Sequence, residues 1–165
     1  MKRIIAVVGV LAVAVSGWLW WRSDERRIGR ALERLERACE KEGPEGALSL
    51  LGRTQTILDA FAPGFRVSAR PYEGTLTDAR ELAGVIHRYR ALSDRIRVRD
   101  AERRIEVQPN GTAEMSALFA VDGSGDGRKG RESFRAQLYW VEVDGDWKIR
   151  EVEVVEVVER SGLFL

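Results

Sequence analysis

Residues 133–158 read SFRAQLYWVEVDGDWKIREVEVVEVV, and this stretch decides the fold of the chain. Apolar and polar residues alternate over residues 133–143, which is typical of a β-strand with one buried face. Asp144-Gly145 is a tight-turn signal, and the alternation resumes over residues 147–158. Its phase shifts between residues 149 and 152, which predicts a bulge. The stretch therefore predicts two long antiparallel strands joined by a short turn.

The chain before this hairpin contains more segments with a period of two. Asn110-Gly111 is a strong hairpin signal, because both residues tolerate the left-handed backbone that a two-residue turn requires. The glycines of residues 122–130 predict a loop between two strands. The other expected strands cover residues 65–72, 95–99, 104–107 and 112–121.

Apolar residues spaced three and four apart predict three helices, over residues 24–42, 45–62 and 77–92. Thr77 is the expected N-cap of the third helix. Helices followed by long antiparallel strands predict an α+β fold, in which the three helices pack on one curved, mostly antiparallel sheet.

This order of elements, ending in Asp144-Gly145-Asp146-Trp147-Lys148-Ile149, resembles the nuclear-transport-factor-2-like superfamily. The resemblance covers residues 24–160 and extends to membrane-anchored bacterial members, in which a span leads straight into the first helix. It implies a cone-shaped, cystatin-like fold with a pocket between sheet and helices. Such pockets hold a carboxylate, a Tyr or a His in the catalytic members, whereas other members are binding or dimerisation modules.

The N-terminus predicts a membrane anchor. Residues 4–21 are 18 residues without a charge, and a helix of that length spans roughly 27 Å, close to the thickness of a bilayer core. Trp18, Trp20 and Trp21 stand at its end, where an aromatic belt is expected. We therefore expect an anchor or uncleaved signal over residues 1–23, followed by an α+β domain over residues 24–165.

A cleaved signal peptide is the alternative, because Ala12-Val13-Ala14 matches an A-x-A cleavage pattern. Cleavage there would leave three Trp residues on an exposed terminus, so the anchor is favoured. Charges flanking the span do not favour a cytoplasmic N-terminus, and long domains translocate regardless of them. We expect a single-pass protein of the inner or cell membrane with its domain on the extracytoplasmic side.

Composition excludes several classes of function. Lys and Arg number 27 against 26 Asp and Glu, which excludes a uniformly basic nucleic-acid binder. A single Cys and a single His exclude an internal disulfide, a multi-Cys zinc site and a multi-His centre. Residues 122–127 resemble the start of a calcium loop, but Ser133 stands where the bidentate Glu belongs. We expect no metal, no cofactor and no nucleic-acid partner.

The candidate pocket residues are few, because the inward positions of the expected strands are mostly apolar. Asp78 has a simpler explanation as a carboxylate at a helix start, and the Tyr residues can serve in packing. No catalytic set can be transferred from the superfamily, so we name no catalytic residue. The residues expected to line the pocket are Tyr72, Asp78, Tyr89, Gln137 and Trp140.

Charge is divided between the strands, with Arg concentrated over residues 88–104 and Glu in the last strand. A solvated edge strand explains this, as does contact with a second copy or another protein through the sheet. Together these features predict a membrane-tethered, non-catalytic binding or assembly module of unknown ligand. The alternatives are a small-molecule isomerase or cyclase-type enzyme that uses the cone pocket, and an accessory subunit of a membrane complex.

Overall fold

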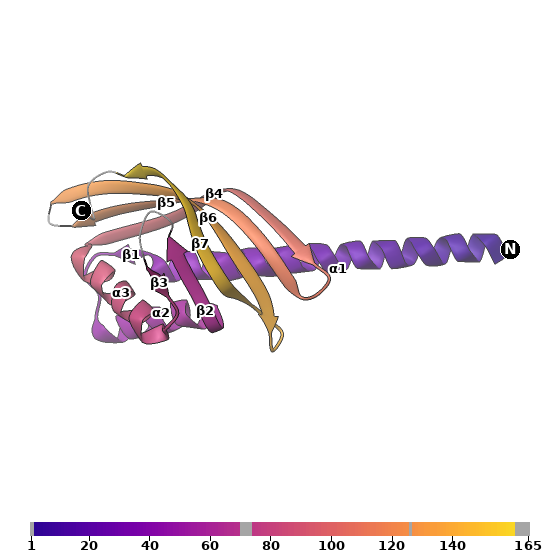
Figure 1. Ribbon diagram of the computed structural model, residues 1–165, viewed down its shortest axis with the longest axis horizontal. Helices are drawn as coiled ribbons and strands as arrows, with labels where there is room; N and C mark the ends of the chain where they lie inside the picture. The colour runs from indigo at the N-terminus through magenta and orange to yellow at the C-terminus, as the bar shows by residue number, and fades with distance from the viewer. Residues whose placement is uncertain (1, 70–73, 126, 161–165) are drawn as a thin grey trace.

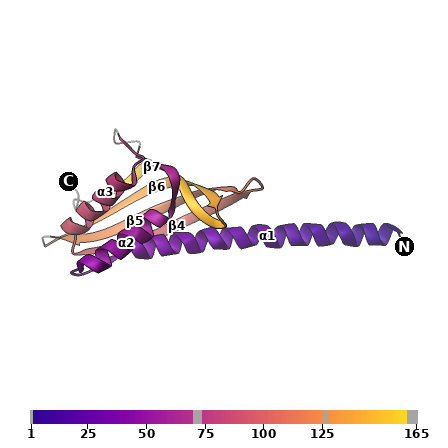
Figure 2. The same ribbon diagram turned by 90° about the horizontal axis from the view of Figure 1, so that it is seen from below.

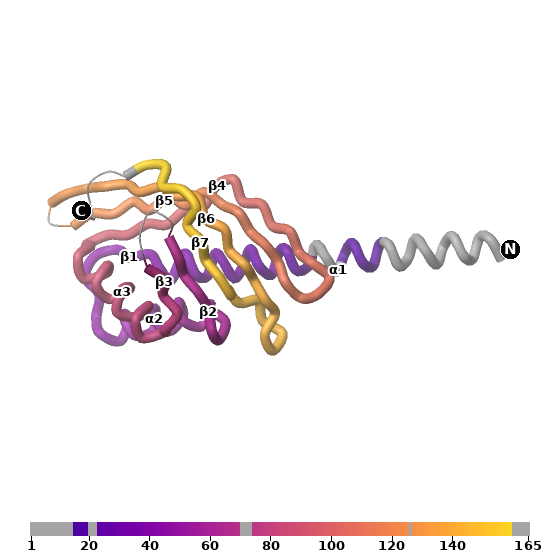
Figure 3. The backbone as a smooth tube through the Cα atoms, in the orientation of Figure 1, coloured from indigo at the N-terminus to yellow at the C-terminus, as the bar shows by residue number. Residues whose placement is uncertain are grey.

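The computed structural model describes residues 2–69, 74–125 and 127–160, with the side chains of residues 2–14, 20–22 and 160 excepted (Figures 1 and 3). In chain order its elements are α1 (Lys2–Cys39), β1 (Lys41–Glu42), α2 (Ala47–Asp59), β2 (Phe61–Ala69), β3 (Thr75–Leu76), α3 (Ala79–Leu92), β4 (Arg95–Gln108), β5 (Thr112–Gly125), β6 (Arg128–Val143) and β7 (Asp146–Arg160).

The strands of the described residues form one seven-stranded sheet in the order β1-β4-β5-β6-β7-β2-β3. Every neighbouring pair is antiparallel except β2 and β7, which run parallel. Figures 1 and 2 show the sheet curving over the helices, which gather against its concave side. The predicted α+β cone with a curved, mostly antiparallel sheet is therefore confirmed.

The long hairpin has the turn and the bulge that its sequence predicts. Asp144 and Gly145 both adopt the left-handed backbone, with φ of 52° and 82°, as a two-residue hairpin turn requires. Trp140 pairs with Ile149, whereas Tyr139 pairs with Glu151, so one extra residue bulges out of β7. The bulge keeps the apolar side chains on both sides of it in the concave face.

Residues 122–130 were expected to form a loop, and this expectation is wrong. β5 continues to Gly125 and β6 begins at Arg128, because cross-strand contacts such as the 2.7 Å bond from Arg131 Nε to the Asp122 carboxylate support pairing. A side chain at Gly125 would collide with the backbone of Leu92 at the end of α3. Glycine here serves close packing rather than flexibility.

The two strand pieces expected over residues 95–107 form one strand, β4. Its pairing with β5 shifts between Ala101 and Arg104, and Glu102 adopts a left-handed φ of 54° at this bulge. The bulge lets Asp100 and Arg103 both point to the concave side, where Arg103 donates two 2.7 Å hydrogen bonds to the Asp100 carboxylate.

The sequence predicts an anchor followed by a separate first helix, but the described chain contains three helices because the two segments merge in α1. The boundary expected at residues 23–24 falls inside α1. Asp24, at this boundary, is 3% exposed, and its Oδ1 accepts hydrogen bonds from Arg27 and Trp147. No Gly or Pro lies between Trp18 and Ile28 to end a helix.

Among the residues whose side chains are described, no helix is long and apolar enough to cross a membrane. Most of the expected span of residues 4–21 lies outside that set, since it includes residues 4–14, 20 and 21. Within the described part of the span, Val15, Trp18 and Leu19 are exposed, each with about half of its surface accessible (51%, 55% and 53%).

α3 begins one residue later than expected. Asp78 rather than Thr77 is the N-cap, and its Oδ1 accepts hydrogen bonds from the backbone N–H groups of Arg80 (2.7 Å) and Glu81 (3.3 Å). His87 of this helix is half-buried, and its Nε2 lies 3.1 Å from Thr54 Oγ1 of α2 in a hydrogen bond. The single His therefore joins two helices.

Arg90 of α3 fastens the end of α1. Its buried guanidinium donates to the carbonyl oxygens of Ala38, Cys39 and Glu40, and it forms a two-bond ion pair with Glu45 (2.9 and 2.6 Å). The last carbonyls of a helix have no partner within the helix, so a cation at this end satisfies them. Arg90 and Glu45 thereby lock α1, α3 and the loop before α2 together.

Candidate functional site

The inner part of the cone is filled by the protein's own side chains. Ile28 and Leu32 of α1 are at most 1% exposed and pack against the concave face of the sheet. Trp140 lies at the centre of this cluster, is 1% exposed, and its Nε1–H has no acceptor among the described residues. The cluster also contains Val107, Ala113, Met115, Ala117, Phe119, Ala136, Leu138, Trp147 and Ile149.

The structure separates the five residues expected to line a pocket. Trp140 is buried in the core, whereas Gln137 is exposed on the opposite, convex side of the same strand. The Asp78 carboxylate is exposed and engaged at the start of α3. Tyr72 lies outside the described residues. Among the four of these residues that the structure describes, only Tyr89 is half-buried, and it lies near another ionisable group.

That group is Glu132 of β6, which sequence reasoning missed as a site residue. Burial, and then the nearby negative charge of Glu132, raise the pKa of Tyr89 well above its usual range. Burial also raises the pKa of the Glu132 carboxyl. Strand alternation could have placed Glu132 inward, because it lies two residues before Phe134 on the same face. Tyr89 and Glu132 are therefore close enough for their charges to interact, and burial favours the protonated form of both.

Glu36 of α1 and Asp100 of β4 form a second pair of neighbouring ionisable side chains. Burial and a hydrogen bond with Asp100 raise the pKa of Glu36 to about 7. The guanidinium of Arg103 holds the pKa of Asp100 below its usual range. The buried Glu36 Oε1 has no donor among the described residues, and two ionised carboxylates can only accept hydrogen bonds. A protonated Glu36 could donate a hydrogen bond to Asp100, which two ionised carboxylates could not share.

The convex side of β4–β7 is here called the outer sheet face. Figure 2 shows the helices on the other side of the sheet. Gln137 and Tyr139 lie on this face, with the Tyr139 hydroxyl donating to Gln137 Oε1 at 3.2 Å, beside a shallow hollow of about 180 Å³. Side chains of this face come from Arg97, Arg99, Arg104, Glu106, Glu114, Ser116, Leu118, Ala120, Asp122, Arg131, Arg135, Gln137, Tyr139, Glu151, Glu153, Glu156 and Glu159.

Charge on the outer sheet face changes sign from one side to the other. The register places Arg104 of β4, Ser116 of β5, Gln137 of β6 and Glu153 of β7 in one row across four strands. Three arginines lie on β4 (Arg97, Arg99 and Arg104) and four glutamates on β7, so the two sides of the face differ in sign. Glu106 also lies on the β4 side, and Glu114, Asp122, Arg131 and Arg135 lie on the two strands between them. The sequence indicated the division, and the register shows that it runs across a single face.

No protein-family model and no curated protein matches the chain. Several solved structures do resemble it in fold. One is a nuclear-transport-factor-2-like protein with a cystatin-like fold from Novosphingobium aromaticivorans, at 13% identity over 86% of this chain and 88% of that one, with a TM-score of 0.68. Another is a hexachlorocyclohexane dehydrochlorinase of type 2, at 7% identity over 84% and 88%, with a TM-score of 0.68.

A third is a protein of unknown function with a cystatin-like fold from Nostoc punctiforme, at 16% identity over 81% of this chain and 90% of that one, with a TM-score of 0.61. At these identities the likeness concerns the fold alone. The chain has the nuclear-transport-factor-2-like, cystatin-like fold that its sequence resembles, and this fold hosts an enzyme in one of the three structures.

Proposed function

We propose that this protein is a non-catalytic assembly module, tethered to a membrane by its N-terminal apolar segment, in which two copies pair through their outer sheet faces. The observation that carries the proposal is the division of charge across that face. A face that is basic on one side and acidic on the other is self-complementary if a two-fold axis brings the opposite sides together.

The direction of the axis follows from the register. An axis running along the strands, between β5 and β6, places β4 of one copy over β7 of its partner. Arg104 then lies opposite Glu153 of the second copy, and Arg99 opposite Glu159. An axis across the strands would instead stack β4 on β4 and bring like charges together. The charges therefore favour the first arrangement.

The size of the face is sufficient for a stable contact. Four strands about 4.8 Å apart and about 13 residues long cover on the order of 800 Å². A typical specific interface buries about 800 Å² on each partner. The centre of the face contains Ser116, Leu118 and Ala120 on β5. Its charged side chains Arg135 and Glu114 already have partners in the same copy, Glu102 for Arg135 and Gln108 for Glu114.

A charge-swap experiment tests the pairing. The variant R99E/R104E reverses two charges on the basic side of the face, and E153R/E159R reverses two charges on the acidic side. We expect each variant alone to weaken self-association of the full chain at least tenfold in sedimentation velocity, in density-matched mild detergent. An equal mixture of the two should form heterodimers, because both charge contacts are restored.

Rescue in the mixture separates a lost contact from a misfolded variant, and circular dichroism of each variant supplies a second check. A wild-type chain that stays monomeric at all concentrations would contradict the pairing. Co-purification with a different protein, and no self-association, would instead favour the accessory-subunit function.

One observation favours a second function, an enzyme of the isomerase or cyclase type. Tyr89 and Glu132 place a phenol and a carboxyl group together under the sheet, and both have raised pKa values. Such a pair could donate and accept a proton at a carbonyl substrate. Turnover of a ketosteroid or a polyketide-like substrate that is lost in both Y89F and E132Q would establish this function over the non-catalytic one.

A further inference from the structure

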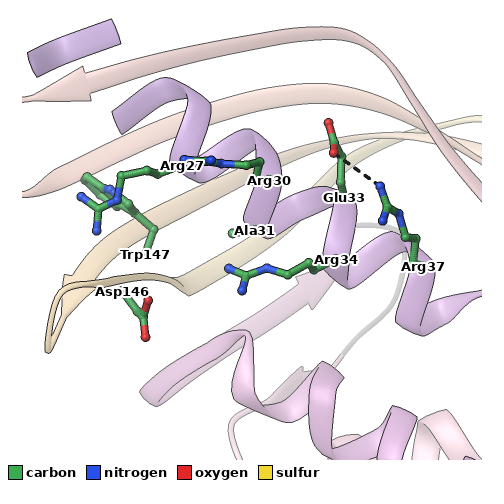
Figure 4. Close-up of a pocket in the computed structure, with 8 residues that line it drawn as sticks. All are labelled: Arg27, Arg30, Ala31, Glu33, Arg34, Arg37, Asp146 and Trp147. Atoms are coloured by element: carbon green, nitrogen blue, oxygen red, sulfur yellow. Dashed lines mark ion pairs between the residues drawn. The ribbon is translucent and has the colours of Figure 1, made fainter. Parts of the chain in front are cut away.

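A hollow of about 490 Å³ lies between α1 and the β6–β7 turn, away from both the outer sheet face and Tyr89. Its size is within the range of small-molecule sites. Figure 4 shows its lining, which is strongly basic on the helix side. The lining residues are Arg27, Arg30, Ala31, Glu33, Arg34, Arg37, Asp146 and Trp147.

The four arginines of this hollow differ in their partners. Arg27 is engaged by Asp24, Glu142 and the carbonyl of Gly145. Arg37 lies 3.8 Å from Glu33, the ion pair drawn in Figure 4. Arg30 and Arg34, by contrast, have no ion-pair or hydrogen-bond partner among the side chains that the structure describes.

Arg30 and Arg34 lie four residues apart, so they are neighbours on one face of α1. Figure 4 shows both side chains extending from the helix toward the end of the hollow where Trp147 lies. Two guanidinium groups at this spacing can bind one phosphate group from two sides, each with paired hydrogen bonds. Four arginines against the two carboxylates Glu33 and Asp146 leave the lining with a positive balance.

The hollow also has a rigid apolar wall. Trp147 is 6% exposed, and its indole N–H is held by Asp24 Oδ1 at 3.2 Å, so its ring position is fixed before any ligand arrives. Ala31 completes this wall, and a neighbouring hollow of about 340 Å³ shares Ala31, Arg34, Asp146 and Trp147 and continues to Lys148. A fixed wall and unengaged cations reduce the cost of ordering the site on binding.

We infer that this hollow binds a phosphate-bearing ligand, with Arg30 and Arg34 holding the phosphate and the Ala31–Trp147 wall contacting the rest of the molecule. The source of the phosphate is either a soluble phosphate ester or the headgroup of an anionic phospholipid. The site lies on the helix that follows the apolar N-terminal segment, so both sources are chemically accessible to it.

Binding is tested on the full chain with inorganic phosphate and glycerol 3-phosphate as probes, by titration calorimetry at constant ionic strength. We expect saturable binding to the wild-type chain that weakens at least tenfold in R30Q/R34Q. The matched control R128Q/K129Q removes the same charge from the exposed β5–β6 turn and should bind as the wild type does. Equal binding by wild type and R30Q/R34Q would overturn the inference.

A vesicle arm distinguishes the two sources. Vesicles of phosphatidylglycerol are compared with vesicles of phosphatidylcholine for co-sedimentation with each variant. Loss of the preference for phosphatidylglycerol in R30Q/R34Q, without binding of the soluble probes, identifies a lipid headgroup as the source. If neither the soluble probes nor phosphatidylglycerol distinguishes R30Q/R34Q from R128Q/K129Q, the site does not exist.

Discussion

Protonation of Glu36 is expected to make the stability of the fold depend on pH. The folded protein retains the Glu36 proton up to about pH 7, whereas the unfolded chain releases it near its ordinary pKa of 4.5. A raised acid pKa stabilises the folded state fully below pH 4.5, and this contribution is lost as pH rises through 7. Asp100 acts in the opposite direction, because its lowered pKa matters only as pH falls below about 3.8.

We therefore expect the wild-type free energy of unfolding to fall by about 1–2 kcal/mol relative to E36Q between pH 5 and 8, a value reduced because Glu36 is partly solvated. Urea denaturation at a series of pH values measures it. E36Q carries a permanent neutral group that can donate to Asp100, so its stability should not change with this titration. Parallel curves for the two proteins would show that Glu36 and Asp100 do not share a proton.

Single residues were the part of the site hardest to predict from sequence. Asp78 could be assigned to a helix start, because a capping carboxylate is a local feature. Glu132 and Glu36 could not be recognised, since their pKa values depend on burial by elements distant in the sequence. That Arg30 and Arg34 have no partner among the described side chains is likewise a result of packing, although their spacing along the helix is visible in the sequence.

At the scale of elements, Arg90 is the contact on which the helical layer depends. Removing its guanidinium would leave the carbonyls of Ala38 and Cys39 without this donor, whereas Glu45 and the Glu40 carbonyl would keep Arg53 as a partner. We expect R90M to lower the free energy of unfolding by about 3 kcal/mol, because two carbonyl oxygens lose their donor and a buried ion pair is broken.

Chemical denaturation measures this effect, with R88M as the control because Arg88 is exposed on the same helix. The control should change stability by less than about 0.5 kcal/mol. Hydrogen exchange should also accelerate at the C-terminal turn of α1 in R90M. A loss no larger than that of R88M would mean that Arg90 contributes little to holding the helices together.

Helices, strands and turns could be predicted where neighbouring residues determine them, and less well where contacts between distant residues do. Both residues of the Asp144-Gly145 turn adopt the left-handed backbone, whereas at Asn110-Gly111 only Gly111 does, with a φ of 75°. The strand formed by residues 122–125 could not be predicted. Gly125 is required by the close approach of Leu92, but in the sequence it cannot be distinguished from a loop glycine. At the boundary between the two predicted segments, Asp24 bonds to Trp147, 123 residues away, a contact that local sequence patterns do not reveal.

For the whole molecule, the layered α+β fold could be predicted because apolar residues recur every two residues in the strands and every three to four in the helices. The function could not be predicted to the same degree, since the fold hosts many activities and the distinguishing surfaces are assembled from several elements. The division of charge across β4–β7 was visible as composition, but its arrangement on one face needed the register.

The proposed tether makes a prediction about where the whole molecule is found. We expect the full chain to stay in the membrane fraction after a carbonate wash, because the uncharged residues 4–21 favour a lipid environment. The variant L11R/V13R, with two charges at the centre of this segment, should shift to the supernatant. Recovery of the wild-type chain in the supernatant without detergent would contradict the tether.

The continuity of α1 has a mechanical consequence. A 38-residue helix is about 57 Å long, and its last turns are clamped by Ile28, Leu32 and Arg90 in the body of the protein. Because α1 is continuous, a membrane or partner that holds its first half also fixes the orientation of the α+β domain. A rotation of one end of α1 would therefore be transmitted to the core at the other end. Two copies anchored through their α1 helices could pair only in the orientations that these helices allow.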